Sequence, residues 1–292
     1  MREVAVAAVQ FACTHDPAAN VATAERLVRE AAARGANVVC LQELFETQYF
    51  CTRQDPALLE LARPLQGHPT VARFQELCRE LGVVVPVSFF ERAGRVFFNT
   101  AAMVDGDGSV LGIYRKSHIP DDPGYFEKYY FSPGDTGFKV WETLHGRIGV
   151  AICWDQWFPE CARAMALMGA ELLLYPTCIG DEPVEYFEPD ISDHWQMTMR
   201  GHAAANVMPV VAANRIGSEQ NPSGAQTYWG QSFIAGQRGE LLAVAPRDEE
   251  EIVTATFDLD ECEFRRREMT IFRDRRVDLY GPLLTLDGTS RR

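Results

Sequence analysis

The sequence lacks several features that mark whole classes of protein. No apolar run approaches the ~18 consecutive residues of a membrane-spanning helix, so we expect no membrane partner. Basic residues are outnumbered by acidic ones, 28 to 41, and the formal net charge of −13 argues against a nucleic-acid-binding protein. No linker, composition shift or short repeat divides the 292 residues, which favours a single domain over 1–292.

Metal-binding and disulfide patterns are missing as well. The eight cysteines include no Cys-x-x-Cys, and the six histidines lack the spacing of metal ligands, so we expect neither a zinc site nor a disulfide framework. Gly-x-Ser-x-Gly, phosphate-loop and Gly-x-Gly-x-x-Gly motifs are also absent. Because no signal peptide is visible before the first strand-like residues, we expect a cytoplasmic protein with reduced thiols.

What is present is an alternation of helical and strand-like periodicity. Buried-strand patterns over 4–10 and 38–41 are separated by a helical pattern over 18–34. The turn Asp105-Gly106-Asp107-Gly108 lies between two strand-like runs and predicts a hairpin. Further helices are expected over 69–81, 159–168 and 191–206, and further strands over 83–89, 147–152, 171–175, 210–214, 231–235, 240–244 and 252–257. This pattern predicts a mixed-sheet α/β domain with helices covering the sheets.

Three reactive side chains stand just beyond expected strand ends. Glu43 follows the expected strand over 38–41, and Lys116 follows the strand that ends near Tyr114. Cys153 follows the strand over 147–152, after which a helix begins near Pro159. Ligands of open α/β sheets bind outside the carboxyl ends of strands, so these groups can converge in one cleft, and the helix N-terminus can favour a thiolate. Each residue also has a plainer interpretation: a buried apolar cysteine, a solvated lysine, and a paired or neutral glutamate.

Taken together, the segments around these residues resemble the nitrilase superfamily of carbon–nitrogen hydrolases. They read LQELF over 41–45, YRKSH over 114–118 and IGVAICWD over 148–155, and the resemblance continues over 272–276 and 278–280. The resemblance implies a four-layer α-β-β-α sandwich. It also implies a homo-oligomer, to whose contacts the C-terminal segment, about 258–292, is expected to contribute.

The resemblance further implies a role for each reactive residue. Cys153 is expected to be the nucleophile and Glu43 the general base. Lys116 is expected to stabilise the oxyanion, together with the backbone N–H of Trp154. Glu127 matches the second glutamate of the family, which orients the substrate and the lysine. No metal or organic cofactor is expected.

The local charges suggest which substrate such a site would take. Gln156 and Trp157 carry no positive charge for a substrate carboxylate, whereas the segment 181–193 contains six acids and no Lys or Arg. These charges favour a substrate with a cationic far end. The resemblance implies that the substrate is a small ureido compound, first of all N-carbamoylputrescine on the route from agmatine to polyamines. The ammonium is expected to contact Glu182 or, failing that, Asp122.

Four further residues are expected to contact the substrate: Trp154, Gln156, Tyr125 and His194. The sequence leaves two alternatives open. One is an amidohydrolase of the same superfamily that acts on another ureido compound or on an ω-amide. The other is a catalytically silent interaction module on the same fold, against which the joint presence of Glu43, Lys116 and Cys153 weighs.

Overall fold

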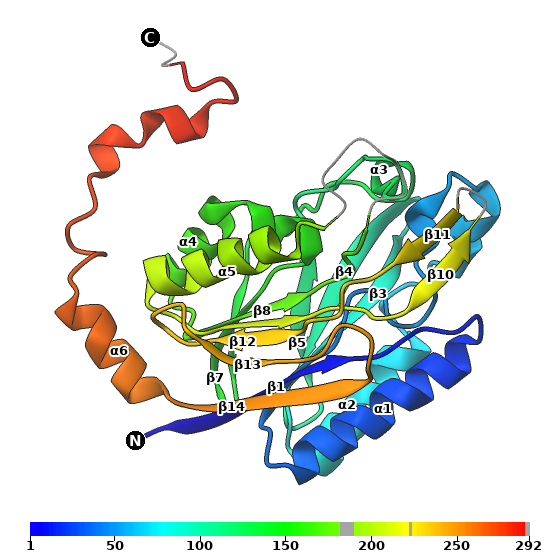
Figure 1. The fold of residues 1–292 in the computed structure, drawn as a ribbon, viewed down its shortest axis with the longest axis horizontal. Coiled ribbons are helices and arrows are strands. Elements are labelled where there is room, and N and C mark those ends of the chain that lie inside the picture. The colour runs from blue at the N-terminus through cyan, green and yellow to red at the C-terminus, as the bar shows by residue number, and fades with distance from the viewer. Residues whose placement is uncertain (182–189, 222–223, 290–292) are drawn as a thin grey trace.

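Short runs of β-branched and small apolar residues build two large sheets that lie face to face (Figure 1). The computed structural model describes residues 1–181, 190–221 and 224–289. Helices cover the outer side of each sheet, so the layers follow the order helix, sheet, sheet, helix. The predicted α-β-β-α sandwich is confirmed.

The first sheet has two halves of three strands that a single bridge joins. One half has the order β14-β1-β2 and the other β3-β4-β5, and Val38 pairs with Val84 between them. β1 and β2 run parallel, while β3, β4 and β5 form an antiparallel meander. The strands are β1 (Glu3–Gln10), β2 (Val38–Cys40), β3 (Val85–Ala93), β4 (Val96–Val104), β5 (Val110–Arg115) and β14 (Glu251–Asp258).

The second sheet has six strands in the order β13-β12-β9-β8-β7-β6. Its centre is parallel, with β8 between β7 and β9, and the outer strands are antiparallel. The strands are β6 (Val140–Thr143), β7 (Gly146–Val150), β8 (Leu172–Pro176), β9 (Val210–Ala213), β12 (Phe233–Ala235) and β13 (Leu241–Val244). A separate hairpin pairs β10 (Ser218–Asn221) with β11 (Gly224–Thr227).

The inner core lies between the two sheets. Val6 and Val38 of the first sheet share one fully buried apolar cluster with Ile148, Leu174 and Val211 of the second. Because the strands at the centre of each sheet are buried on both faces, their sequences read as continuous apolar runs rather than as alternation. The carboxyl ends of β2 and β8 meet in this arrangement, since the Glu43 N–H donates to the Thr177 carbonyl at 3.2 Å.

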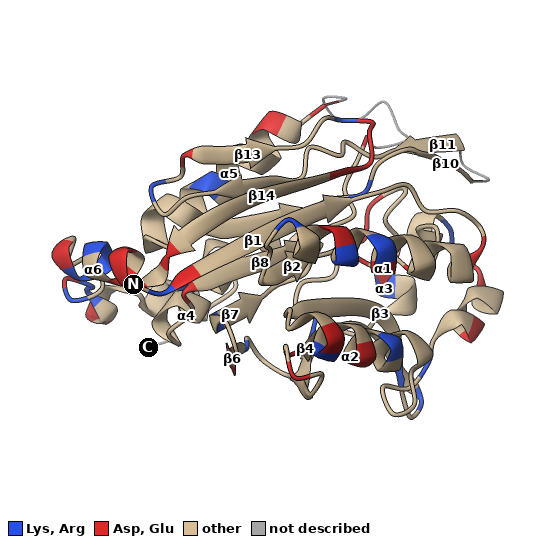
Figure 2. Cartoon of the chain, turned by 90° about the horizontal axis from the view of Figure 1, so that it is seen from below, with Lys and Arg blue, Asp and Glu red and all other residues tan. Residues whose placement is uncertain are grey.

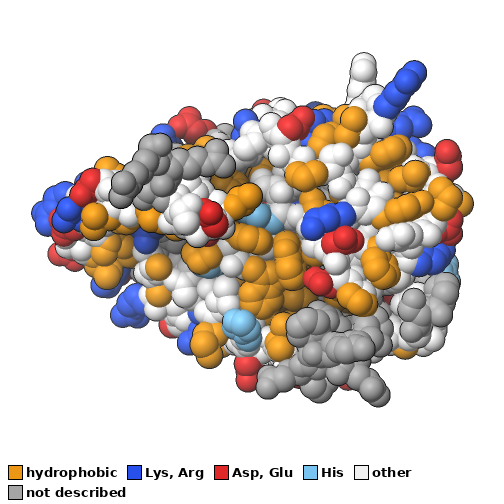
Figure 3. Space-filling view, turned by 90° about the horizontal axis from the view of Figure 1, so that it is seen from above, with side chains coloured by type: hydrophobic (Ala, Val, Ile, Leu, Met, Phe, Trp, Pro, Cys, Tyr) orange, Lys and Arg blue, Asp and Glu red, His pale blue; other side chains and the backbone are white. Residues whose placement is uncertain are grey.

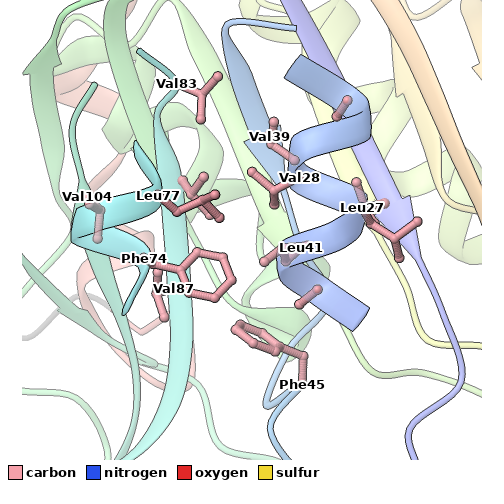
Figure 4. Packing of buried hydrophobic residues seen from close by; sticks show 14 of the residues in the cluster. Leu27, Val28, Val39, Leu41, Phe45, Phe74, Leu77, Val83, Val87 and Val104 are labelled. Carbon is pink, nitrogen blue, oxygen red and sulfur yellow. The ribbon is translucent and has the colours of Figure 1, made fainter. Parts of the chain in front are cut away.

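Helices α1 (Pro17–Ala33) and α2 (Pro69–Leu81) cover the outer face of the first sheet. Val28 of α1 lies beside Val39 (Figure 4), and Leu27 of α1, Leu41 and Phe74 of α2 belong to the same buried cluster. Asp16 caps the start of α1 through its side chain, and α2 ends at Gly82 in the left-handed conformation that glycine favours. The charged residues of both helices, marked by colour along the ribbon in Figure 2, are exposed or partly exposed.

Helices α4 (Pro159–Leu167) and α5 (Ser192–Asn206) cover the second sheet. Met165 and Trp195 are fully buried against Leu173 and Phe233 of the sheet below. α4 begins at Pro159, whose missing N–H costs nothing at the first turn of a helix. α3 (Glu127–Tyr130) is a single turn beside the carboxyl ends of the strands.

The C-terminal segment leaves the body of the molecule after β14 (Figure 1). It comprises α6 (Leu259–Glu268) and two short 3₁₀ turns, η4 (Val277–Leu279) and η5 (Gly281–Leu284). Its side chains are largely exposed, Leu284 to 88% and Leu286 fully. Within the described parts of the chain, no helix is long and apolar enough to cross a membrane.

The expected elements agree with the observed ones to within a few residues, and the hairpin at Asp105–Gly108 joins β4 to β5. Several elements were not predicted, among them β6, the β10–β11 hairpin, the single-turn helix α3, the 3₁₀ turns and α6. The hairpin strands are mostly polar, and α6 has few buried positions, so neither shows the apolar periodicity on which the prediction relied.

Candidate active site

The three reactive side chains meet at the carboxyl ends of β2, β5 and β7. Glu43, Lys116 and Cys153 come from the segments that follow these strands, and all three are at most 4% exposed. Lys116 Nζ lies 2.9 Å from Glu43 Oε1 and 2.7 Å from Glu127 Oε2. The structure therefore brings the lysine and both predicted glutamates into one buried cluster.

Electrostatics fixes the charge of the lysine. Burial alone would lower the pKa of Lys116, but the carboxylates of Glu127 and Glu43 outweigh it and hold the pKa well above its usual value. The pKa of Glu127 is raised, whereas the carboxyl of an ordinary ion pair has a lowered pKa. Burial and the charge of Glu43 raise it, and together they outweigh the opposing effect of Lys116. Lys116 thus remains an ammonium, and the pKa of the Glu127 carboxyl is raised to about 7.

Cys153 occupies a strained turn directly after β7. Its φ angle is 41°, in the left-handed region that non-glycine residues rarely adopt and that costs roughly 1–3 kcal/mol. Asp155 holds this turn: its Oδ2 accepts from the Ile152 N–H at 2.9 Å and from the Tyr114 hydroxyl at 2.7 Å. Its Oδ1 accepts from the His118 N–H at 3.0 Å and lies 2.7 Å from the His118 ring.

The free thiol is protonated in this setting. Burial raises the pKa of Cys153 well above its usual value, the charge of Glu43 adds to this, and Lys116 opposes it. A 3₁₀ turn, η3 (Cys153–Trp157), separates the cysteine from α4, so the expected support of a thiolate by the helix N-terminus does not dominate. The thiol therefore needs a base, and its S–H points to the Cys178 carbonyl oxygen at 3.8 Å.

Glu43 has one oxygen held and one oxygen free for such a role. Oε1 accepts from Lys116 and, at 2.6 Å, from Asn99 Nδ2. Oε2 is buried and has no hydrogen-bond partner among the described residues. Glu127 is held similarly, since its Oε1 accepts from the Tyr49 hydroxyl at 2.7 Å. The site combines a buried thiol, a carboxylate oxygen with an open lone pair, and a fixed ammonium donor.

Gln156 lies beside this cluster, and hydrogen bonds fix the orientation of its side-chain amide. Its Oε1 accepts from the Trp195 indole N–H at 2.8 Å and from the Thr177 hydroxyl at 3.3 Å. Its fully buried Nε2 has no partner in the described part of the chain, so the amide presents donors and no charge. Trp154 is partly buried, and its ring centroid is 6.3 Å from that of Trp157.

The other predicted substrate contacts lie at different depths. Tyr125 is buried, and its hydroxyl is bonded to the backbone of Gly180 in both directions, at 3.0 and 3.2 Å. Asp122 is partly exposed and closes a turn in which its carbonyl accepts from the Tyr125 N–H. His194 is exposed on α5, with its ring 5.2 Å from Trp157. Glu182 lies outside the described residues.

Three residues that hold the site were not singled out from the sequence: Asn99, Tyr49 and Asp155. Asn99 was detectable in principle, as an amide in the middle of the otherwise apolar strand β4. Asp155 lies within the resembling segment but was given no role. Tyr49 had no detectable pattern, because only the tertiary structure brings its hydroxyl to Glu127, 78 residues away.

Neither metal-ligand clusters nor disulfides occur in what the structure describes. Within residues 1–181, 190–221 and 224–289, no group of three or more His, Cys, Asp or Glu side chains is placed to hold a metal ion. All eight cysteines are free and buried. The charged groups that surround Cys153 within this part of the chain are Glu43, Glu127 and Lys116.

Comparisons with known proteins agree with this geometry. The sequence profile described as carbon-nitrogen hydrolase matches residues 5–267. An N-carbamoylputrescine amidase of Solanum lycopersicum is 58% identical, over 99% of this chain and 97% of that protein. A citrullinase of Francisella tularensis is 47% identical, over 97% and 99% of the two chains.

A solved structure of similar fold gives the same result. The carbon-nitrogen hydrolase of Helicobacter pylori has a TM-score of 0.89 and 40% sequence identity, and the match covers 97% of this chain and 99% of that one. The likeness extends over both sheets and their helices. It is therefore a likeness of the whole fold rather than of one motif.

Proposed function

This chain belongs to the carbon–nitrogen hydrolase family, and we propose that it hydrolyses N-carbamoylputrescine to putrescine, carbon dioxide and ammonia. The observation that carries the proposal is the buried cluster of Cys153, Glu43, Lys116 and Glu127 in a chain 58% identical to an N-carbamoylputrescine amidase. It is an enzyme acting on a linear carbon–nitrogen bond of a ureido compound.

The first chemical step is attack of the Cys153 sulfur on the ureido carbonyl carbon. Because burial keeps the thiol protonated, the proton passes to Glu43, whose Oε2 is the buried carboxylate oxygen without a partner among the described residues. A new S–C bond forms, and the carbonyl π electrons move to the oxygen, which becomes an oxyanion. Lys116 and the backbone N–H of Trp154 stabilise that oxyanion.

Collapse of this tetrahedral intermediate breaks a C–N bond. The leaving nitrogen takes the proton from Glu43 and departs as ammonia, which leaves a carbamoyl thioester on Cys153. Glu43 then takes a proton from a water molecule as its oxygen attacks the thioester carbon. The C–S bond breaks, the thiol regains its proton, and the released carbamic acid decomposes to carbon dioxide and the amine.

The fixed positions of the charged groups support these reaction steps. Lys116 is fixed between Glu43 and Glu127, so it meets the developing oxyanion without a change of rotamer. Preorganised donors in a buried site are each worth about 3 kcal/mol of transition-state stabilisation. Glu127, anchored by Tyr49, keeps the ammonium aimed while Glu43 gains and loses its proton.

The cationic end of the substrate has a restricted choice of carboxylates. Asp181 is bonded to the Trp229 indole N–H at 2.6 Å, and Asp190 is paired with Arg247 at 2.7 Å. These acids of the 181–193 segment are therefore engaged. Asp122 remains as a partly exposed candidate, and Glu182, our first choice for the ammonium, lies outside the described residues. Trp154, Gln156, Tyr125 and His194 remain proposed contacts for the ureido group and the chain.

A second candidate substrate is citrulline, because a citrullinase is 47% identical over almost the whole chain. Citrulline has the same ureido group but adds a carboxylate at the far end. The neutral amide of Gln156 and the absence of a charged side chain at Trp157 favour the diamine derivative.

Ammonia release tests these assignments. N-carbamoylputrescine, citrulline and N-carbamoyl-β-alanine are compared at equal concentration, with the Cys153→Ser variant as the blank. Preference for N-carbamoylputrescine is expected. Preference for N-carbamoyl-β-alanine would overturn the proposed pocket for a cation. Preference for citrulline would replace the first candidate substrate by the second, and activity on none of the three would overturn the proposed reaction.

We also propose that the C-terminal segment contacts a second copy of this chain. Phe264, Leu283 and Leu284 are 54%, 62% and 88% exposed, and they lie on a segment that projects from the body. Apolar side chains are also exposed on the face seen in Figure 3, and Met197 of α5 is 66% exposed. Apolar surface of this kind favours association. Light scattering should show an oligomer that Leu283→Asp/Leu284→Asp dissociates; a monomeric wild type would reject the proposal.

The thiols bear on the compartment. We propose that the enzyme works in the cytoplasm, where cysteines stay reduced. The eight free, buried cysteines support this, as does the dependence of the proposed mechanism on a reduced Cys153. Fractionation of cells that express the protein checks the assignment, and recovery in a secreted fraction would contradict it.

A further inference from the structure

A second buried ion pair lies beside the segment that carries Glu43. The side chain of Arg215, after β9, is fully buried, and its Nη1 lies 2.7 Å from Glu219 Oε1. The same Nη1 donates to the Thr47 carbonyl at 3.0 Å. Nη2 donates to the carbonyls of Leu44 at 3.0 Å and Glu43 at 3.2 Å. One planar guanidinium therefore holds three carbonyls of the segment that follows β2.

This segment needs such a hold because its backbone is strained. Leu44 has a φ angle of 49°, which places a bulky residue in the left-handed region at a cost of roughly 1–3 kcal/mol. Its N–H donates to the Ser88 hydroxyl at 3.0 Å, and its carbonyl is held by Arg215. The strained peptide is directly adjacent to Glu43, so its conformation sets the direction of the Glu43 side chain.

Glu219, the acidic partner of Arg215, is linked through Tyr49 to Glu127, the second carboxylate of the site. Glu219 Oε2 accepts from the Tyr49 N–H at 2.7 Å and from the Tyr228 hydroxyl at 3.2 Å. Tyr49 in turn donates its hydroxyl to Glu127 at 2.7 Å. The ion pair thus contacts the main chain of Glu43 on one side and, through Tyr49, the side chain of Glu127 on the other.

We propose that Arg215 and Glu219 are positioning residues that set the separation of Glu43 and Glu127 around Lys116. The inference deepens the proposed function and rests on it. A buried ion pair is a poor source of stability, since apolar replacement of both partners is often neutral or stabilising. Its contacts here instead go to the segment that carries Glu43 and to Tyr49, whose hydroxyl bonds to Glu127.

Three variants separate positioning from support of the fold: Arg215→Met, Glu219→Gln and the double variant. Arg215→Met leaves a buried anion, and Glu219→Gln leaves a buried cation, so each single variant should lower Tm. The double variant removes both charges, and its Tm should recover toward wild type. Its kcat should stay about 100-fold low, with KM changed less than about threefold, because the carbonyls around Glu43 remain unheld.

A matched control is Glu171→Gln at the opposite end of the sheets, where Glu171 pairs with Arg2 at 2.6 Å. It should leave kcat unchanged. Recovery of kcat together with Tm in the double variant would reduce the pair to a structural role and overturn the proposal. If Arg215→Met does not fold, the single variant Arg215→Lys replaces it. Lys keeps the charge but lacks the fork, so Tm should stay near wild type while kcat falls.

A readout without substrate keeps this test separate from the proposed reaction. The rate at which iodoacetamide alkylates Cys153, followed by peptide mass analysis, depends on Glu43 as the base. Arg215→Met should slow it about tenfold, and an unchanged rate would reject the positioning role. If wild type releases no ammonia from any ureido compound while the alkylation difference persists, the proposed function fails and the positioning inference survives.

Discussion

The two ends of the sheets hold ion pairs of almost the same length in different surroundings. At the carboxyl ends, Lys116 lies 2.9 and 2.7 Å from Glu43 and Glu127, with all three side chains out of contact with water. At the amino ends, Arg2 lies 2.6 Å from Glu171, and the arginine side chain is half exposed. The distances alone do not distinguish the two groups.

Because the ion pairs at the two ends differ in burial, removing one partner has different consequences at each end. A solvated pair contributes at most about 1 kcal/mol, whereas breaking a buried pair by removing one partner costs about 3–5 kcal/mol. The carboxyl ends also contain strained backbone at Leu44 and Cys153, and Glu43 has a carboxylate oxygen without a hydrogen-bond partner in the described part of the chain. Costly features of this kind concentrate where a protein acts on a ligand. The difference predicts that substitutions at one end affect rate and those at the other affect little.

The largest effect is expected from Cys153→Ser. Replacing the proposed sulfur nucleophile by a hydroxyl should lower ammonia release on the order of 10⁴-fold or more, because the atom proposed to form the new bond is lost. The change in volume is small, so the free energy of unfolding should stay within about 1 kcal/mol of wild type. Steady-state rates and thermal denaturation check both points. A rate within tenfold of wild type would remove Cys153 from the mechanism.

Lys116→Ala should reduce the rate almost as strongly and also destabilise the fold. It removes the proposed oxyanion donor and leaves two buried carboxylates facing each other, at a cost of about 3 kcal/mol. The fold should survive, because burial has already raised the pKa of Glu127 and that group can become neutral. Urea denaturation measures the loss. A variant that turns over normally would contradict the assigned role of Lys116.

Asn99→Leu should have an intermediate effect on rate. It removes the 2.6 Å hydrogen bond to Glu43 Oε1 without changing charge, so kcat should fall about tenfold with KM nearly unchanged. Asn206→Leu is the matched control: Asn206 is also buried, also donates one bond, here to the His202 carbonyl, and lies on α5. Equal losses of kcat in the two variants would mean that the bond to Glu43 has no particular role.

The smallest effect is expected at the amino ends, from Glu171→Gln. Burial opposes ionisation of Glu171, but hydrogen bonds from Arg2 and the Arg147 N–H outweigh it and lower its pKa. A lowered pKa means that this stabilisation is present above the usual glutamate range and is lost as pH falls through the lowered value. Wild type should exceed the variant by less than about 1 kcal/mol at pH 7 and by nothing near pH 2. Denaturation at both pH values tests this; an equal gap at both would contradict it.

Much of the fold was predictable because burial on both faces leaves continuous apolar runs. β1, β7 and β8 appeared as such runs, and α1 appeared through its apolar spacing. β10 and β11 did not, since their pairing depends on cross-strand hydrogen bonds rather than on apolar content. The three segments that carry Glu43, Lys116 and Cys153 were identified by their residues and their order, and the structure brings them together.

The sequence by itself determined which groups are available: a thiol, a lysine, several glutamates, and the strand ends on which they stand. Their state was decided only by the tertiary structure, because pKa, orientation and pairing depend on neighbours distant in the chain. Arg215 meets Glu43 across 172 residues, and Tyr49 meets Glu127 across 78. Such contacts have no local pattern. They arise when two sheets pack face to face and remove these groups from water, where each must find a partner or remain, like Glu43 Oε2, open to a substrate.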